Sequence, residues 1–158
     1  MSLVLAGTLV LVAGVMIILP DLPPTSKVRN IRLKEPLRIY TIDGRLMGEF
    51  GDERRITVSI KDTPDQLIEA ILAAEDDRFF KHHGVDFSGV IRAIIANLRS
   101  RDSRQGASTI TMQVARNYFL SREKTYSRKI KEVLLALRLE RELTKVQILE
   151  LYLNKIFL

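Results

Sequence analysis

Cysteine is absent from this chain of 158 residues. Its absence excludes disulfide bonds and thiolate metal sites, although it leaves the cellular compartment open. The sequence also contains no internal repeat. A chain of this length can form one domain with a substantial hydrophobic core.

Lysine and arginine are absent before the apolar run at residues 3–19, in which Thr8 is the one polar residue. A secretory signal peptide would need a basic segment before this run and a small-residue cleavage site after it. Because both are missing, residues 1–20 are predicted to form a transmembrane anchor. A helix over the run spans about 26 Å, slightly less than a bilayer core of roughly 30 Å.

The cations nearest this run follow it, at Lys27, Arg29, Arg32 and Lys34. Taken literally, the positive-inside rule would place the domain in the cytoplasm. We expect instead that the start of the chain is cut or misassigned and that a short basic head precedes the run.

Charge is distributed unevenly over a chain with a net charge of +6. Residues 99–131 hold nine basic and two acidic residues, a local charge of +7, which leaves −1 for the rest. A focused basic patch indicates an anionic partner such as nucleic acid, anionic lipid or phosphate. A solvated helix face is the alternative, and the absence of an aromatic-rich basic groove disfavours nucleic acid.

Turn residues and apolar periodicity divide the remaining chain into predicted elements. Residues 37–51 are typical of a hairpin with Asp43-Gly44 as a two-residue turn, and residues 54–60 of a third strand. Five helices are predicted after that, at residues 64–75, 87–98, 109–120, 126–143 and 145–158. Their expected N-caps are Thr63 (a capping box with Gln66), Asp86, Ser108 and Thr144 (a capping box with Gln147).

The predicted architecture is mainly α, with a small N-terminal β element and one N-terminal transmembrane helix. Residues 1–20 form the anchor and residues 21–35 a stiff Pro-rich linker. Residues 36–61 form the β element and residues 62–158 the helical domain. The chain stops within a predicted helix, so we expect it to end before the fold does.

The segment AAEDDRFFKHHGVD at residues 73–86 gathers acids, aromatic residues and both histidines. Glu75 ends a predicted helix, where the negative end of the helix dipole disfavours a charged carboxylate. The neighbouring Phe79 and Phe80 are expected to remove part of its hydration. Both effects favour the protonated form, which suits a general acid or base. Ordinary solvated loop acids are the alternative.

His82 and His83 suggest a metal site together with Asp86. Adjacent side chains point in different directions, however, so metal ligation is the weaker hypothesis. We predict instead that His82 is structural and holds the loop by a hydrogen bond.

The segment GASTITMQ at residues 106–113 opens a predicted helix with small hydroxyl residues. Free backbone N–H groups at such a helix start can bind an anion. The segment is no P-loop, because no lysine follows at the required spacing. An ordinary serine cap is the alternative.

Arg128 and Glu132, in RKIKE at residues 128–132, are four residues apart and share a helix face. A surface ion pair is the ordinary explanation. Further cations are near in the sequence, at Arg116, Lys124, Lys129 and Lys131. Such a cluster can neutralise a diphosphate, and Glu132 would then be the second carboxylate of a pair, as in sugar-transfer chemistry. The residues thus indicate a membrane-bound enzyme or binder acting on a lipid-linked anionic sugar.

Four ordered motifs resemble glycosyltransferase family 51, the peptidoglycan glycosyltransferase domain of class A penicillin-binding proteins. They are EDxxFxxHxG at Glu75, Asp76, Phe79, His82 and Gly84; GxSTIxxQ at Gly106, Ser108, Thr109, Ile110 and Gln113; RKxxE at Arg128, Lys129 and Glu132; and KxxILxxYLN at Lys145, Ile148, Leu149, Tyr152, Leu153 and Asn154. The resemblance covers about residues 36–158 and is closest to the 1A type.

The resemblance implies a lysozyme-like fold and the polymerisation of lipid II into glycan strands, with Glu75 and Glu132 as catalytic residues. Glu75 would be the general base on the 4-hydroxyl of the acceptor GlcNAc. Undecaprenyl diphosphate would leave the donor MurNAc with inversion. Glu132 and a divalent metal (Mg or Mn) could act at the diphosphate. Substrate-binding residues implied by the motifs and the basic cluster are Asp76, Phe79, His82, Gly84, Ser108, Thr109, Gln113, Arg116, Lys124, Arg128 and Lys129.

The same resemblance implies a single-pass protein on the outer, periplasmic face of the cytoplasmic membrane. Its partners would be lipid II, the growing glycan strand and other cell-wall synthesis proteins, with no nucleic acid. Residues 99–105 would form a flap over the glycan. Tyr152 and Asn154 would serve packing and helix anchoring.

Two features depart from the family pattern. Met112 replaces a glutamine that the family often has in its second motif, a change we expect to be tolerated. The fifth motif and any transpeptidase domain are missing after residue 158, so we expect a fragment. The rival functions are a lytic transglycosylase or lysozyme-like hydrolase and a non-catalytic membrane-anchored module that binds anionic lipid or nucleic acid. The basic cluster disfavours the hydrolase, which expels no diphosphate.

Overall fold

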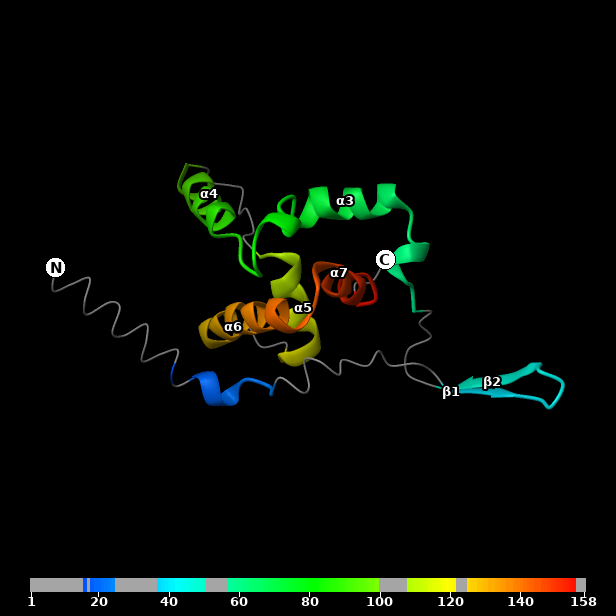
Figure 1. Cartoon of the computed structure of the whole chain (residues 1–158). Helices are drawn as coiled ribbons and strands as arrows, with labels where there is room; N and C mark the ends of the chain where they lie inside the picture. The colour runs from blue at the N-terminus through cyan, green and yellow to red at the C-terminus, as the bar shows by residue number, and fades with distance from the viewer. Residues whose placement is uncertain are drawn as a thin grey trace.

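The computed structural model describes residues 16, 18–24, 37–50, 57–99, 108–121 and 125–155. Most of these residues are helical, and the described strands form one two-stranded sheet (Figure 1). The α-helices are α3 (Asp65–Glu75), α4 (Phe87–Arg99), α5 (Ile110–Phe119), α6 (Tyr126–Glu142) and α7 (Lys145–Leu153). The strands are β1 (Leu37–Tyr40) and β2 (Leu46–Phe50), and the 3₁₀ helices are η1 (Leu19–Asp21), η2 (Ile60–Asp62) and η3 (Phe79–Lys81). The predicted mainly α architecture with a small β element is confirmed.

Several predictions fall on residues outside the described parts of the chain. These residues include most of the predicted anchor and Pro-rich linker, residues 54–56 of the third strand, the loop at 100–106 and Lys124. Within the described residues, no helix combines the length and apolar character needed to span a bilayer.

Helix α5 is the centre of the described core, and it packs against both α6 and α7 (Figure 1). Ile110 and Val114 stand one turn apart on α5 and are fully buried. They pack with Leu135 and Leu139 of α6 and with α7. Burying each such side chain contributes roughly 1.5–3 kcal/mol, so this contact holds the C-terminal helices together.

The helix starts are set by side chains that differ in part from those predicted. The capping box of Thr144 and Gln147 is confirmed. Helix α5 starts one residue later than predicted, because Thr109 rather than Ser108 accepts a hydrogen bond from the N–H of Met112. The prediction for Thr63 is also wrong: its hydroxyl donates to the Ser59 carbonyl, and Pro64 stands at the N-cap of α3.

The described part of the predicted third strand is not a strand. The Val58 N–H donates to Asn154 Oδ1 at 2.8 Å, and Asn154 Nδ2 donates to the Val58 carbonyl at 2.8 Å. The N–H of Ile60 donates to Glu150 Oε2 at 3.0 Å. Side chains of α7 and its C-cap thus make the backbone hydrogen bonds that a neighbouring strand would make. Asn154 also ends α7, which was predicted to continue to residue 158.

The predicted hairpin is present, but its turn is longer than two residues. The Thr41 N–H donates to the Arg45 carbonyl at 2.8 Å, and the Gly44 N–H donates to the Thr41 carbonyl at 2.9 Å. Residues 42–44 therefore form the loop, and Gly44 takes the positive φ of 79° that such a loop requires. In Figure 1 the hairpin lies apart from the helices.

Residues 18–24 are attached to α6 rather than projecting freely. Leu22 is buried in the main core cluster. Asp21 forms an ion pair with Lys131 at 3.0 Å, and Arg138 donates a hydrogen bond to the Pro23 carbonyl. These contacts join the start of the predicted linker to the helix that carries Arg128 and Glu132.

Gly84 closes the segment between α3 and α4. Its φ of 88° belongs to the left-handed region, and its carbonyl accepts a hydrogen bond from Thr109 Oγ1 at 2.6 Å. A Cβ at this position would lie 2.9 Å from the backbone oxygen of Ala136 on α6. Gly84 is therefore a structural requirement of this contact.

We predict that Gly84→Ala lowers the free energy of unfolding by roughly 2–4 kcal/mol, through backbone strain and overpacking together. Denaturant unfolding measures the loss. Gly44→Ala is the matched control, since Gly44 has a similar φ of 79° but no atom within 4 Å of the added Cβ. Equal losses in the two variants would show that the contact with α6 contributes nothing.

Candidate functional site

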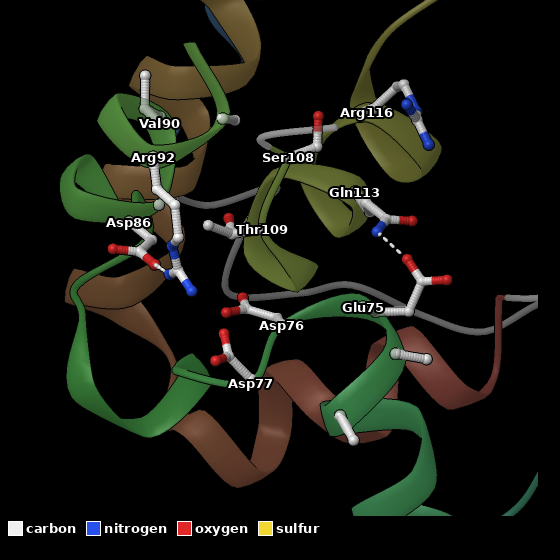
Figure 2. A pocket seen from close by; sticks show the side chains of 14 residues that line it. Glu75, Asp76, Asp77, Asp86, Val90, Arg92, Ser108, Thr109, Gln113 and Arg116 are labelled. Carbon is white, nitrogen blue, oxygen red and sulfur yellow. Dashed lines mark hydrogen bonds and ion pairs between the residues drawn. The ribbon is translucent and has the colours of Figure 1, made fainter. Parts of the chain in front are cut away.

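A groove of about 600 Å³ lies between the end of α3, one face of α4 and the first turns of α5 (Figure 2). Small residues at one face of α4 leave room for it, with Gly89 and Ala93 one turn apart. The lining residues are Ala73, Ala74, Glu75, Asp76, Asp77, Asp86, Gly89, Val90, Arg92, Ala93, Ser108, Thr109, Gln113 and Arg116. Six of the predicted site residues are among them.

Glu75 is the last residue of α3, and its carboxylate lies at the end of the groove near Gln113 and Arg116 (Figure 2). Gln113 Nε2 donates a hydrogen bond to Glu75 Oε2 at 2.8 Å. Glu75 is solvent exposed, so the expected partial loss of hydration is wrong. The reason is that Phe79 turns into the core with 1% exposure, while Phe80 remains 58% exposed.

Asp76 follows α3 and is buried, and its carboxylate lies at the N-terminal end of α5. Its Oδ2 accepts a hydrogen bond from the Ile110 N–H at 3.0 Å, and both oxygens lie 3.0 Å from His82 Nε2. The predicted anion site at this helix start is therefore already filled by a carboxylate of the same chain. An internal carboxylate at the positive end of the helix dipole is stabilising.

The structural role predicted for His82 is confirmed by this contact with Asp76, since both side chains are buried. His83 is exposed. The part of the chain that the structure describes contains no group of three or more acidic or histidine side chains arranged to hold a metal.

The basic cluster adjoins the groove through Ser108. Lys129 Nζ lies 2.7 Å from Ser108 Oγ and 3.0 Å from Glu132 Oε2. Arg128 forms the predicted i, i+4 pair with Glu132 at 3.6 Å. Glu132 is 2% exposed and does not line the groove, so its carboxylate binds the two cations from behind.

A metal at the diphosphate does not fit these residues well. The buried carboxylate of Glu132 already faces Lys129 and Arg128. Its Oε1 and the Nε of Arg128 have no hydrogen-bond partner among the described residues. A divalent ion would have to displace two cations from the carboxylate, and we derive no step through a metal.

The far end of the groove contains residues that the sequence analysis did not assign to it: Asp77, Asp86 and Arg92 (Figure 2). Arg92 lies 3.8 Å from Asp86 and its side chain is 55% exposed. Its spacing of three residues from Gly89 on α4 was the signal available in the sequence, because positions i and i+3 are neighbours on a helix surface.

Asp86 caps α4 as predicted. Burial opposes its ionisation, but hydrogen bonds from the Gly89 N–H and the Ser88 hydroxyl, with Arg78 and His82 nearby, hold the pKa of the carboxyl below its usual value. Arg78 also lies 3.6 Å from the carboxylate.

Tyr152 of α7 lies in the core beneath the Glu75 end of the groove. Burial raises the pKa of its hydroxyl, the charge of Glu75 raises it further, and Arg116 lowers it. Tyr152 is 4% exposed, so the packing role predicted for it is confirmed, as is helix anchoring by Asn154.

The structure separates the predicted residues into three groups. Glu75, Asp76, Ser108, Thr109, Gln113 and Arg116 line the groove. Lys129 contacts it through Ser108. Phe79, His82 and Gly84 are buried beside it, Arg128 and Glu132 stand behind Lys129, and Lys124 is outside the described residues. Met112 packs with Val85 and Ala136 at 2% exposure, which explains why an apolar side chain suits that position.

Comparison with known proteins adds independent information. The family model described as Transglycosylase matches residues 43–158. Penicillin-binding protein 1A of Pseudomonas aeruginosa is 49% identical over 155 residues, which cover 98% of this chain and 19% of that protein. The Escherichia coli protein of the same name is 52% identical over 139 residues, covering 88% and 16%. That of Haemophilus influenzae is 54% identical over 126 residues, covering 80% and 15%. This chain thus spans less than a fifth of the length of these relatives.

We predict that Asp86 contributes stability that is lost in acid. Its pKa is lowered in the folded state, so the contribution is complete above the unfolded value of about 3.9 and is lost as the pH falls through the lower, folded value. Thermal melting between pH 6 and pH 2 measures this. Asp86→Asn should flatten the acid side of the curve, whereas exposed Asp65→Asn should leave it as in the wild type. Identical curves for wild type and Asp86→Asn would contradict the prediction.

Proposed function

This chain belongs to the transglycosylase family, and we propose that it is a peptidoglycan glycosyltransferase that polymerises lipid II into glycan strands. The resemblance to glycosyltransferase family 51 is confirmed by the matched relatives. The observation that carries the proposal is the exposed Glu75 carboxylate, oriented by Gln113 at one end of a groove that adjoins the Ser108–Lys129 contact.

Glu75 is suited to the role of general base. Gln113 binds one of its oxygens at 2.8 Å, which orients the carboxylate toward the groove while leaving capacity to accept a proton. In the proposed step Glu75 takes the proton of the 4-hydroxyl of the acceptor GlcNAc. The oxygen attacks the anomeric carbon of the donor MurNAc from the face opposite the leaving group, so the configuration inverts.

The leaving group, undecaprenyl diphosphate, gains negative charge as the glycosidic bond forms. Arg116 lines the groove, Lys129 contacts its Ser108 edge, and Arg128 pairs with Glu132 next to Lys129. These three cations, with Lys124, are proposed to bind the diphosphate. Fixed positive charge where negative charge develops stabilises the transition state. In this scheme Glu132 acts on the reaction through Lys129 and Arg128, which it holds in place.

The wider setting follows from the same proposal. We infer a lysozyme-like domain over residues 62–158, joined by the Pro-rich linker and β element to an anchor at residues 1–20. The domain would act at the outer face of the cytoplasmic membrane, where lipid II and the growing strand are its substrates. Other cell-wall synthesis proteins are its proposed partners.

We predict that Glu75→Gln lowers kcat by about 10²- to 10⁴-fold, because the amide cannot accept the proton. Polymerisation of labelled lipid II measures the rate. The matched control is Glu69→Gln, an exposed glutamate on the same helix outside the groove, which should retain wild-type activity. Purified glycan is run as a second substrate, and its shortening by the wild type would favour a hydrolase instead.

We predict that Arg116→Gln lowers kcat/KM roughly 10-fold or more at unchanged melting temperature. The loss is electrostatic: a charge-assisted contact to phosphate is worth about 1.5–3 kcal/mol. Arg141→Gln on the exposed surface of α6 is the control. Lipid II turnover at low and high salt measures the effect, and an unchanged kcat/KM would remove Arg116 from the diphosphate site.

A further inference from the structure

Lys145, the first residue of α7, makes a partly buried polar contact outside the lining of the groove. Its Nζ donates a hydrogen bond to Glu140 Oε1 at 2.7 Å, and Thr111 of α5 donates to the same oxygen at 2.7 Å. The side chains of Lys145 and Glu140 are only 18% and 6% exposed. In such a shielded pair, loss of one partner leaves the other charge uncompensated.

The same ammonium group also holds an aromatic ring of the first motif. Lys145 Nζ lies 4.3 Å from the centre of the Phe79 ring, within the range of a cation–π attraction. The N–H of Phe79 in turn donates to the Asp76 carbonyl at 3.0 Å. Lys145 of α7 is therefore connected, through Phe79, to the turn that directly follows Glu75.

Nothing in this arrangement requires Lys145 to meet the substrate. Lys145 does not line the groove, and its charge is directed at Glu140 and Phe79. Packing alone would be satisfied by an apolar residue over the ring, whereas the pair with Glu140 fixes the ammonium group in one position. Phe79 is 1% exposed and packs in the main core cluster, and the ammonium group of Lys145 lies over its ring.

We propose that Lys145 is a positioning residue for Glu75. Bound to Glu140 and placed over Phe79, it fixes the turn at residues 76–79 and thereby the direction in which the Glu75 carboxylate enters the groove. This inference rests on the proposed glycosyltransferase function, in which Glu75 is the base. Small displacements of a catalytic group lower the chemical rate more than they lower substrate binding.

The first test is steady-state kinetics of the full protein with labelled lipid II. Lys145→Met should lower kcat by about 10- to 100-fold while KM stays within about twofold. Lys145→Arg keeps the charge and should recover most of the rate. Lys155→Met is the matched control, because Lys155 lies 5.5 Å from the ring centre of Tyr118 at the other end of α7, and it should behave as the wild type.

The second test needs no activity. Amide hydrogen exchange reports the turn directly, since the Phe79 N–H donates to the Asp76 carbonyl within it and the Lys81 N–H donates to the Arg78 carbonyl at its end. Lys145→Met and Glu140→Gln should speed exchange at these amides relative to those of α6, and Lys155→Met should not.

The outcomes separate this inference from the proposed function. Wild-type kcat and exchange in Lys145→Met would overturn the inference, and so would faster exchange spread evenly over all helices in both Lys145→Met and Glu140→Gln. A raised KM at unchanged kcat would overturn it as well. A wild type that makes no glycan would refute the proposed function, while the exchange at Phe79 would still decide whether Lys145 holds the turn.

Discussion

The contact between the Asp76 carboxylate and the start of α5 is the constraint on which the rest of the described helical structure depends. One side chain accepts the Ile110 N–H and meets His82, so the end of α3, the loop at residues 76–84 and α5 are joined at one point. A second tie follows nearby, from Thr109 to the Gly84 carbonyl. Both contacts lie inside the protein. Glu75, in the same acidic segment, remains exposed at the groove, and Gln113 orients its carboxylate.

Three shielded acidic side chains of the described helical region are each paired with a basic or histidine side chain, whereas Glu75 and Arg116 line the groove. Asp76 with His82, Glu132 with Lys129 and Glu140 with Lys145 are pairs whose acidic member is shielded from solvent. Shielded pairs keep their side chains in place, because loss of one partner leaves the charge of the other buried and uncompensated. Glu75 and Arg116, by contrast, keep access to the groove. This division is what a site acting on a charged, solvated substrate needs.

Helices could be predicted well because their signals are local. The period of α6 and the capping box at Thr144 lie within a few residues, and both were correct. The failures have a common cause in distant partners. Residues 57–60 have a strand-like sequence, but Asn154 and Glu150 of α7 bind their backbone. Ser108 and Thr109 are equivalent caps locally, and the Gly84 carbonyl, 25 residues away, selects Thr109.

By itself the sequence determined the helix pattern, the basic cluster and the residue types of the site, because periodicity, charge and motif spacing are properties of neighbouring residues. Only the tertiary structure decided which side chains face the groove. It placed Asp76 and His82 inside as a pair, put Glu132 behind Lys129, and brought Arg92 of α4 into the site. Such choices depend on burial and on contacts between residues far apart in the chain, which local patterns do not encode.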